Sequence, residues 1–182
     1  MTDDAAIEWV AGLFPFRAPR GRPVTLMFTD IAGFTVHTAT LGDRAALRLL
    51  RRHDRAVLPA LRWHGGHILK RLGDGLMAAF PTPPDAVAAA LAMQHAAALR
   101  PGVGLRIGIH SGAASSRAGD LVGHEVNVAA RIADRAPRGR ILVSDAVRAA
   151  AENVPACFRS VAPLALPGMP PTRLYCVTEV DG

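Results

Sequence analysis

Two aspartates of this 182-residue chain stand where a strand-like run gives way to a glycine-containing turn. Asp30 follows the apolar run 24–29, and Asp74 lies in a Gly-Asp-Gly turn between the strand-like runs 67–72 and 76–80. If these runs pair, both carboxylates meet at one sheet edge, where two like charges need a cation between them. Carboxylate oxygens suit Mg²⁺ or Mn²⁺, which keep some waters and take substrate phosphates. Each aspartate also has a purely structural interpretation: Asp74 as a turn residue and Asp30 as a helix cap.

Lys70 is the one lysine among 21 basic residues, and it precedes Asp74 by four positions. An even offset within a strand keeps two side chains on one face. A compact ammonium group can also reach an acceptor atom that a flat guanidinium would overshoot. Lys70 is therefore a candidate for ligand recognition beside a candidate metal carboxylate. A solvated surface lysine would fit the same sequence pattern.

A third segment, 119–131, contains Asn127 and Arg131 four residues apart, which places them on one face of the helix expected at 124–135. An amide and a guanidinium on one face can orient a sugar and neutralise charge on a transferring phosphoryl group. Asp120, just before this helix, can accept a hydrogen bond from an exocyclic amine. Judged alone, Arg131 is equally one of many surface arginines.

The elements that must position these residues alternate along the chain. Apolar periodicity and turn residues predict helices at 43–63, 86–99, 124–135 and 145–152, and strands at 24–29, 67–72, 76–80, 105–110, 141–143, 158–166 and 173–180. The order is that of a split βαβ unit, so we expect an α+β, ferredoxin-like (βαββαβ-based) sandwich. Its sheet is expected to be mostly antiparallel, with the helices on one face.

Composition narrows the class of protein. Half of the residues are apolar and 20% are charged, which supports one packed domain, expected at 23–182 after a leader or arm at 1–22. No apolar stretch is long enough for a transmembrane helix, and two cysteines make no disulfide scaffold, so we expect a cytoplasmic protein. The net charge of +6 suits a polyanionic ligand without choosing one.

Five motifs taken together resemble the class III nucleotidyl cyclases, in particular the stand-alone bacterial adenylyl cyclase domains. The resemblance runs from about residue 23 to residue 177, and its motifs occupy 28–35, 70–75, 106–112, 119–131 and 139–144. Each motif is moderately specific, and their order and spacing together are highly specific. The resemblance implies an enzyme that converts ATP to 3′,5′-cyclic AMP and pyrophosphate.

The resemblance also implies a role for each matching position. Asp30 and Asp74, with the carbonyl of Ile31, match the ligands of two Mg²⁺ or Mn²⁺ ions. Lys70 and Asp120 match the pair that reads adenine, through ring nitrogen N1 and the 6-amino group. Asn127 matches the residue that positions the ribose, and Arg131 matches the transition-state arginine.

A head-to-tail homodimer is implied as well, because in this family the metal aspartates and the Asn/Arg pair come from opposite subunits. Three other hypotheses stay open: a guanylyl or mixed-specificity cyclase, a catalytically idle regulatory dimer, and a non-catalytic nucleotide- or RNA-binding module. The low aromatic content of 5% disfavours RNA binding, since sheets that bind RNA stack bases on exposed aromatic residues. We therefore expect no nucleic-acid partner.

Some positions depart from the family pattern. His124 stands where many relatives have an acidic or small residue, and no role is assigned to it. Pro167-Gly168 replaces a Lys-Gly pair, so a phosphate contact from that region would have to come from Arg173. The loop 112–123 is short, which leaves room only for a small dimerisation arm. The regulatory signal, the preferred metal and the dimer affinity are not encoded in any motif.

Overall fold

The computed structural model describes residues 23–113, 115–117, 120–168 and 170–180. Side chains are described throughout these ranges except at 115–117 and 120. The leader expected at 1–22 lies outside them. No helix within the described ranges is long and apolar enough to cross a lipid bilayer.

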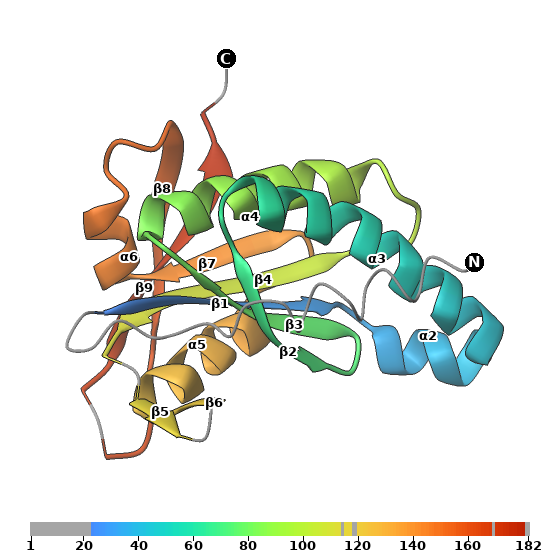
Figure 1. The fold of residues 1–182 in the computed structure, drawn as a ribbon, viewed down its shortest axis with the longest axis horizontal. Helices are drawn as coiled ribbons and strands as arrows, with labels where there is room; N and C mark the ends of the chain where they lie inside the picture. The colour runs from blue at the N-terminus through green and yellow to red at the C-terminus, as the bar shows by residue number, and fades with distance from the viewer. Residues whose placement is uncertain (1–22, 114, 118–119, 169, 181–182) are drawn as a thin grey trace.

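A seven-stranded sheet forms the centre of the molecule, with the strand order β2-β3-β1-β4-β7-β9-β8 (Figure 1). All neighbours in it are antiparallel except β4 and β7, which confirms the expected mostly antiparallel α+β fold. Its strands are β1 (Val24–Ile31), β2 (His67–Leu72), β3 (Gly75–Phe80), β4 (Leu105–Gly112), β7 (Arg140–Ser144), β8 (Ala156–Leu164) and β9 (Thr172–Glu179). The order β2-β3-β1-β4 is the arrangement that a βαββαβ unit requires.

The helices lie on both faces of the sheet, so the expectation of helices on one face is wrong. Helices α3 (Asp43–Trp63) and α4 (Pro83–Ala98) share a core with the odd-numbered strand residues Met27 and Ile31. Helix α5 (His124–Arg135) packs on the even-numbered Leu26 and Phe28, which point to the opposite face. Figure 1 shows α3 and α4 on one side of the sheet and α5 on the other.

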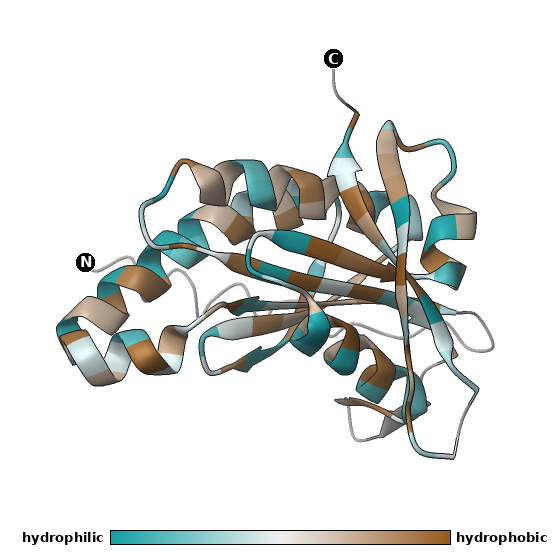
Figure 2. Ribbon diagram, turned by 180° about the vertical axis from the view of Figure 1, so that it is seen from behind, coloured by the Kyte–Doolittle hydropathy of each residue, from teal (hydrophilic) through white to brown (hydrophobic). Residues whose placement is uncertain are grey.

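Gly108 lets α5 approach β4 closely. A Cβ atom at Gly108 would lie 2.2 Å from the backbone nitrogen of Ala133, so only glycine fits there. Apolar residues concentrate in the central strands and on the inner sides of the helices (Figure 2). The buried sides of α5 and of α3 therefore fix the orientation of both helices against the sheet.

Some elements differ from the sequence-based expectation. Helix α2 (Phe34–Leu41) was not predicted, because none of its residues is buried and it has no apolar stripe. The loop 112–123 contains a small two-stranded ribbon of β5 (Ser115–Arg117) and β6 (Asp120–Val122). The last helix, α6 (Asp145–Ala150), ends two residues earlier than expected, whereas α3 continues through Pro59 to Trp63 as predicted.

Candidate active site

The Asp30 carboxylate lies at the end of β1 and is paired with a cation from the neighbouring strand. Asp30 stands opposite Arg106 of β4 in the antiparallel ladder, and the two side chains form an ion pair. Both are partly exposed, at 28% for Asp30 and 29% for Arg106. Arg106 also has its Nε atom buried without an acceptor among the described residues. Sequence reasoning assigned Arg106 no role, although it begins one of the five motifs.

Asp74 is held against the same end of β1. The backbone N–H of Ile31 donates to Asp74 Oδ2 at 3.1 Å, across a sequence separation of 43 residues. β3, which follows Asp74, pairs antiparallel with β1, with Leu76 opposite Thr29. The condition that the first strand pairs with the hairpin is therefore met, and the Asp30–Ile31 segment and Asp74 share one edge.

The donor set at this edge fits a hard divalent cation. It offers two carboxylates and a backbone carbonyl, and oxygen ligands of this kind are those that Mg²⁺ and Mn²⁺ prefer. Within the described ranges there is no cluster of three or more His, Cys, Asp or Glu residues that could hold a metal ion. The ion pair with Arg106 shows that Asp30 already engages a positive charge.

Lys70 lies on β2 opposite Met77, whose side chain belongs to the core beneath α5. Directly opposite residues of an antiparallel pair share a face, so the exposed Lys70 side chain lies on the α5 side of the sheet. A register shift between Ile68 and Lys70 accompanies this placement. Asp120 opens β6, but its side chain is outside the described set.

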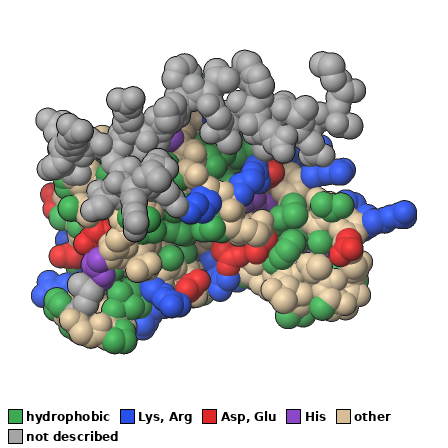
Figure 3. All heavy atoms as spheres, turned by 60° about the horizontal axis from the view of Figure 1, so that its bottom comes forward, with side chains coloured by type: hydrophobic (Ala, Val, Ile, Leu, Met, Phe, Trp, Pro, Cys, Tyr) green, Lys and Arg blue, Asp and Glu red, His purple; other side chains and the backbone are tan. Residues whose placement is uncertain are grey.

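Asn127 and Arg131 lie on the outer side of α5, directed away from their own sheet. The buried residues of α5 are others, namely Val128, Ala129, Ile132 and Ala133. Arg131 is 65% exposed and makes its ion pair with Asp134 on the same helix, at 3.3 Å. On the face that carries α5, acidic, basic and apolar side chains lie close together (Figure 3). Among the described residues, the Asn127 and Arg131 side chains thus lie on the part of α5 that does not pack against the sheet.

Helix α5 is tied to the sheet by a pair that sequence reasoning missed. His110 of β4 is buried, and its Nε2 atom is hydrogen-bonded to Glu125 in the first turn of α5. The Gly-Ile-His-Ser-Gly motif contains this histidine, but nothing in the sequence indicates its partner. The pair holds the N-terminal end of the helix that carries Asn127 and Arg131.

Two further positions are on the surface. Arg173 is exposed on β9, and it has no ion pair with any residue in the part of the chain that the structure describes. His124 is exposed at the first position of α5, and nothing in the structure explains its presence there.

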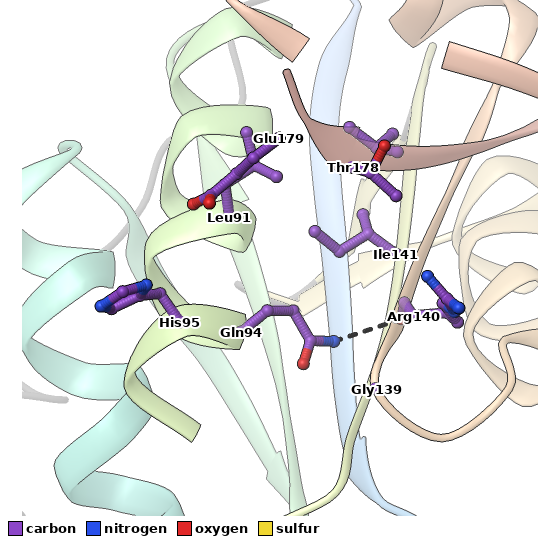
Figure 4. A pocket seen from close by; sticks show the side chains of 9 residues that line it. Leu91, Gln94, His95, Gly139, Arg140, Ile141, Thr178 and Glu179 are labelled. Atoms are coloured by element: carbon purple, nitrogen blue, oxygen red, sulfur yellow. Dashed lines mark hydrogen bonds between the residues drawn. The ribbon is translucent and has the colours of Figure 1, made fainter. Parts of the chain in front are cut away.

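A small cavity lies elsewhere, between α4 and the strands β7 and β9. Its volume is about 200 Å³, and Gln94, Arg140 and Glu179 contribute to its lining (Figure 4). The Nε2 atom of Gln94 donates to the backbone oxygen of Arg140 at 3.3 Å. None of the predicted site residues lines this cavity, so it does not account for their arrangement.

Comparison with known proteins decides the family. The family model for the adenylate and guanylate cyclase catalytic domain matches residues 16–179. The chain belongs to this family. The resemblance inferred from the five motifs is thereby confirmed.

Relatives of this cyclase domain occur in longer proteins. The chain is 34% identical over 143 residues to a pH-sensitive adenylate cyclase of Mycobacterium tuberculosis, covering 75% of this chain and 34% of that protein. It is 28% identical over 153 residues to a serine/threonine-protein kinase of Myxococcus xanthus, covering 80% of this chain and 18% of that protein. The chain thus spans about a third or less of these two relatives.

Solved structures of the family share the fold. An adenylate/guanylate cyclase/hydrolase from Silicibacter pomeroyi superimposes with a TM-score of 0.76 and 28% identity, over 88% of this chain and 98% of that one. An adenylyl cyclase from P. aeruginosa gives a TM-score of 0.73 and 24% identity, over 88% and 95% of the two chains. The expected α+β catalytic-domain fold is confirmed. Both adenylyl and guanylyl cyclases occur among the similar structures.

Proposed function

We propose that the chain is an adenylyl cyclase domain that converts ATP to 3′,5′-cyclic AMP and pyrophosphate. The observation that carries this proposal is the hydrogen bond from Ile31 to Asp74. It joins the two carboxylate-bearing segments at one edge, as a site for a metal–triphosphate complex requires. The ribose 3′-oxygen attacks the α-phosphorus in line and pyrophosphate leaves, so the reaction occurs within one nucleotide.

The roles of the residues are those that the resemblance to the family implies. Asp30, Asp74 and the carbonyl of Ile31 would hold Mg²⁺ or Mn²⁺. When bound, a pair of such ions lowers the pKa of the attacking hydroxyl and neutralises the triphosphate. Asp30 would exchange its ion pair with Arg106 for the bound ion, and the Arg106 guanidinium would then be available to contact a phosphate.

The nucleoside end of the site is assigned to the other group of residues. Lys70 and Asp120 would read N1 and the 6-amino group of adenine, and Asn127 would orient the ribose. Arg131 would stabilise the charge that develops on the phosphoryl oxygens. Arg173, on β9, would make a further phosphate contact. Only its position in the sequence supports this role.

We infer that each site is shared between two copies in a head-to-tail homodimer. Asn127 and Arg131 are on the outward side of α5, and their helix is buried against its own sheet. Arg131 therefore cannot turn inward without unpacking α5 from β4. A second copy that presents its Asp30 edge to this face completes one site, and the symmetric contact completes the other.

A guanylyl cyclase remains the second candidate, because similar structures include guanylyl cyclases. Lys70 and Asp120 favour ATP, since an ammonium donates to adenine N1 while guanine carries a hydrogen there.

The experiment is to incubate the purified chain with Mn²⁺ and either ATP or GTP, and to measure both cyclic nucleotides over a range of protein concentrations. We expect cyclic AMP as the main product, with specific activity that rises with concentration as dimers form. Predominant cyclic GMP would support the alternative candidate. Absence of both products, with salt-sensitive RNA binding instead, would contradict a cyclase function.

A further inference from the structure

A buried histidine lies directly beneath the edge that carries the two aspartates. His53, in the middle of α3, is 1% exposed and faces the sheet. Both of its ring nitrogens have partners: Nδ1 lies 3.1 Å from Asp54 Oδ1, and Nε2 lies 3.4 Å from Thr29 Oγ1. A buried imidazole is costly unless both nitrogens are satisfied. The pairing shows that this histidine belongs to a built network rather than to apolar packing.

The direction of the hydrogen bonds follows from Asp54. Burial raises the pKa of this carboxyl group, but hydrogen bonds from His53 and Arg71 outweigh burial and hold the pKa below its ordinary value. An ionised carboxylate only accepts, so His53 Nδ1 donates to it. In the neutral ring Nε2 must then accept, and the Thr29 hydroxyl donates to it.

The network continues to both flanks of Asp74. The Thr29 oxygen accepts from the backbone N–H of Leu76 at 3.3 Å, two residues after Asp74. Arg71, three residues before Asp74, donates from Nη1 and Nη2 to the two Asp54 oxygens, each at 3.2 Å. The hairpin turn that carries Asp74 is therefore anchored on both sides to the same pair, His53 and Asp54.

The other end of the network adjoins Asp30. Thr29 directly precedes Asp30, and its side chain points to the α3 face while that of Asp30 points to the α5 face. The strands approach so closely here that a Cβ atom at Gly75 would lie 1.9 Å from the Thr29 carbonyl oxygen. β1 and β3 are thus in close contact at Thr29, so a displacement of β1 here would be transmitted to β3.

We propose that His53 is a positioning residue that, through Thr29, fixes Asp30 and Asp74 at the spacing that the divalent ions of the cyclase require. The inference rests on the proposed function, because it takes those two aspartates as the metal ligands. His53 does not touch substrate or ion, and it acts through the Thr29 hydroxyl and the Asp54–Arg71 pair. Outer partners of metal ligands commonly change metal affinity or activity by about 10-fold to 100-fold when they are removed.

The first test compares two substitutions of Thr29 that differ by one group. Thr29→Val keeps the shape and removes the hydroxyl, whereas Thr29→Ser keeps the hydroxyl and removes a methyl group. We expect Thr29→Val to raise the free Mn²⁺ concentration for half-maximal cyclic AMP formation by about 10-fold or more. Thr29→Ser should stay within about threefold of the unmodified chain, since its hydroxyl can still donate to His53.

A binding measurement separates positioning from turnover. The probe is 3′-deoxy-ATP, which lacks the attacking hydroxyl, titrated by calorimetry at increasing free Mn²⁺. The Mn²⁺ concentration that supports binding should shift in Thr29→Val by the same factor as in the activity assay. A purely structural role would lower the thermal midpoint of both variants and leave the Mn²⁺ requirement unchanged.

Substitutions at His53 then test the direction of action. His53→Leu should reproduce the Mn²⁺ shift of Thr29→Val, and the double variant should add little to either, because both break one chain of bonds. His53→Gln places an amide oxygen where Nε2 accepts, and it should restore part of the Mn²⁺ affinity. Circular dichroism of each variant confirms that it is folded, and the Thr29 pair decides the question if His53→Leu is not.

The Asp30 and Thr29 variants together distinguish a failure of the positioning role from a failure of the metal assignment. If Asp30→Asn abolishes turnover while Thr29→Val and Thr29→Ser both keep the normal Mn²⁺ requirement, the positioning role of His53 is refuted and the metal assignment stands. If Asp30→Asn keeps turnover and its Mn²⁺ dependence, the metal assignment is refuted and the inference falls with it.

Discussion

At the scale of single residues, the lowered pKa of Asp54 couples this network to stability at acid pH. Burial alone would raise the pKa of Asp54 above its ordinary value of 3.8. The hydrogen bonds from His53 and Arg71 have the larger combined effect, so the pKa lies below that value. A carboxyl group whose pKa is depressed on folding contributes stability above its unfolded value, and that stability is lost as the pH falls through the folded value. Asp54 therefore stabilises the fold at neutral pH and ceases to do so in acid.

We predict that Asp54→Asn flattens the acid side of the stability curve. The free energy of unfolding of the unmodified chain should fall as the pH drops below 3.8. The variant should be less stable at neutral pH and lose less on acidification. Urea unfolding at a series of pH values measures both curves, and two parallel curves would contradict the coupling.

Base specificity is also decided by single residues. Lys70→Glu combined with Asp120→Asn exchanges a donor for an acceptor opposite N1 and supplies an amide donor for the guanine O6 atom. We predict that the ratio of kcat/KM for ATP to that for GTP falls by about tenfold or more, because unmatched polar groups are strongly rejected. Lys70→Arg, which keeps the charge, is the control, and an unchanged ATP preference in the double variant would refute the assignment.

At the scale of elements, α3 has a row of like charges on its outer side. Arg44, Arg48, Arg51 and Arg55 follow at intervals of four, three and four, and all are exposed. None of the four has an ion pair with a residue in the described ranges. Like charges at such intervals on a helix repel each other by about 0.2–0.5 kcal/mol per pair. The row therefore weakens a helix that is held in place by its buried side.

Arg48→Glu should accordingly stabilise the domain by about 1 kcal/mol at low salt, because it turns the repulsive pairs with Arg44 and Arg51 into attractive ones. The gain should shrink as salt is added, since exposed charges are screened. Arg62→Glu is the matched control: it has no arginine one turn away, and it puts a negative charge at the C-terminal end of the helix. Chemical denaturation at two ionic strengths compares them, and equal effects would contradict the repulsion.

The contact of α5 with β4 sets the position of Asn127 and Arg131. In Gly108→Ala the new Cβ atom meets the Ala133 backbone, which cannot move without displacing the helix. We predict a loss of about 1–3 kcal/mol in stability together with a larger fractional loss of cyclase activity. Gly104→Ala is the control, because its Cβ atom meets the flexible side chain of Arg138 instead. Denaturation and turnover measured on both variants would show whether the two effects separate.

At the scale of the whole molecule, the shared site makes a prediction about mixed dimers. Asp30→Ala and Arg131→Ala should each be inactive alone, and equal mixing should restore about a quarter of the normal activity per chain. Half of the dimers are then mixed, and each has one intact site of its two. The measurement is the rate of cyclic AMP formation after the two variants have been mixed and equilibrated.

A second mixture controls for nonspecific rescue. Asp30→Ala and Asp74→Ala both remove a metal ligand from the same half of the site. Every mixed dimer therefore has two defective sites. We expect no recovery there. Equal recovery in both mixtures, or none in either, would contradict a site built from opposite halves of two chains.

The sequence by itself determined the order and type of most elements and the identity of the reactive groups. Helix α3 and helix α5 begin and end where the apolar period and the turn residues predict, because both signals are local. The hairpin around Asp74 follows from the same local chemistry, since a Gly-Asp-Gly turn joins two strand-like runs. The family could be inferred because its motifs consist of such local runs.

Only the tertiary structure decided which groups meet. The pairing of Asp30 with Arg106 joins residues 76 positions apart, and that of Thr29 with His53 joins residues 24 apart. Helix α5 lies on the far face of the sheet because alternate residues of β1 are apolar on both faces, a pattern that does not say which helix covers which face. Cross-strand register and helix placement depend on the packing of the whole core, so no local stretch of sequence encodes them.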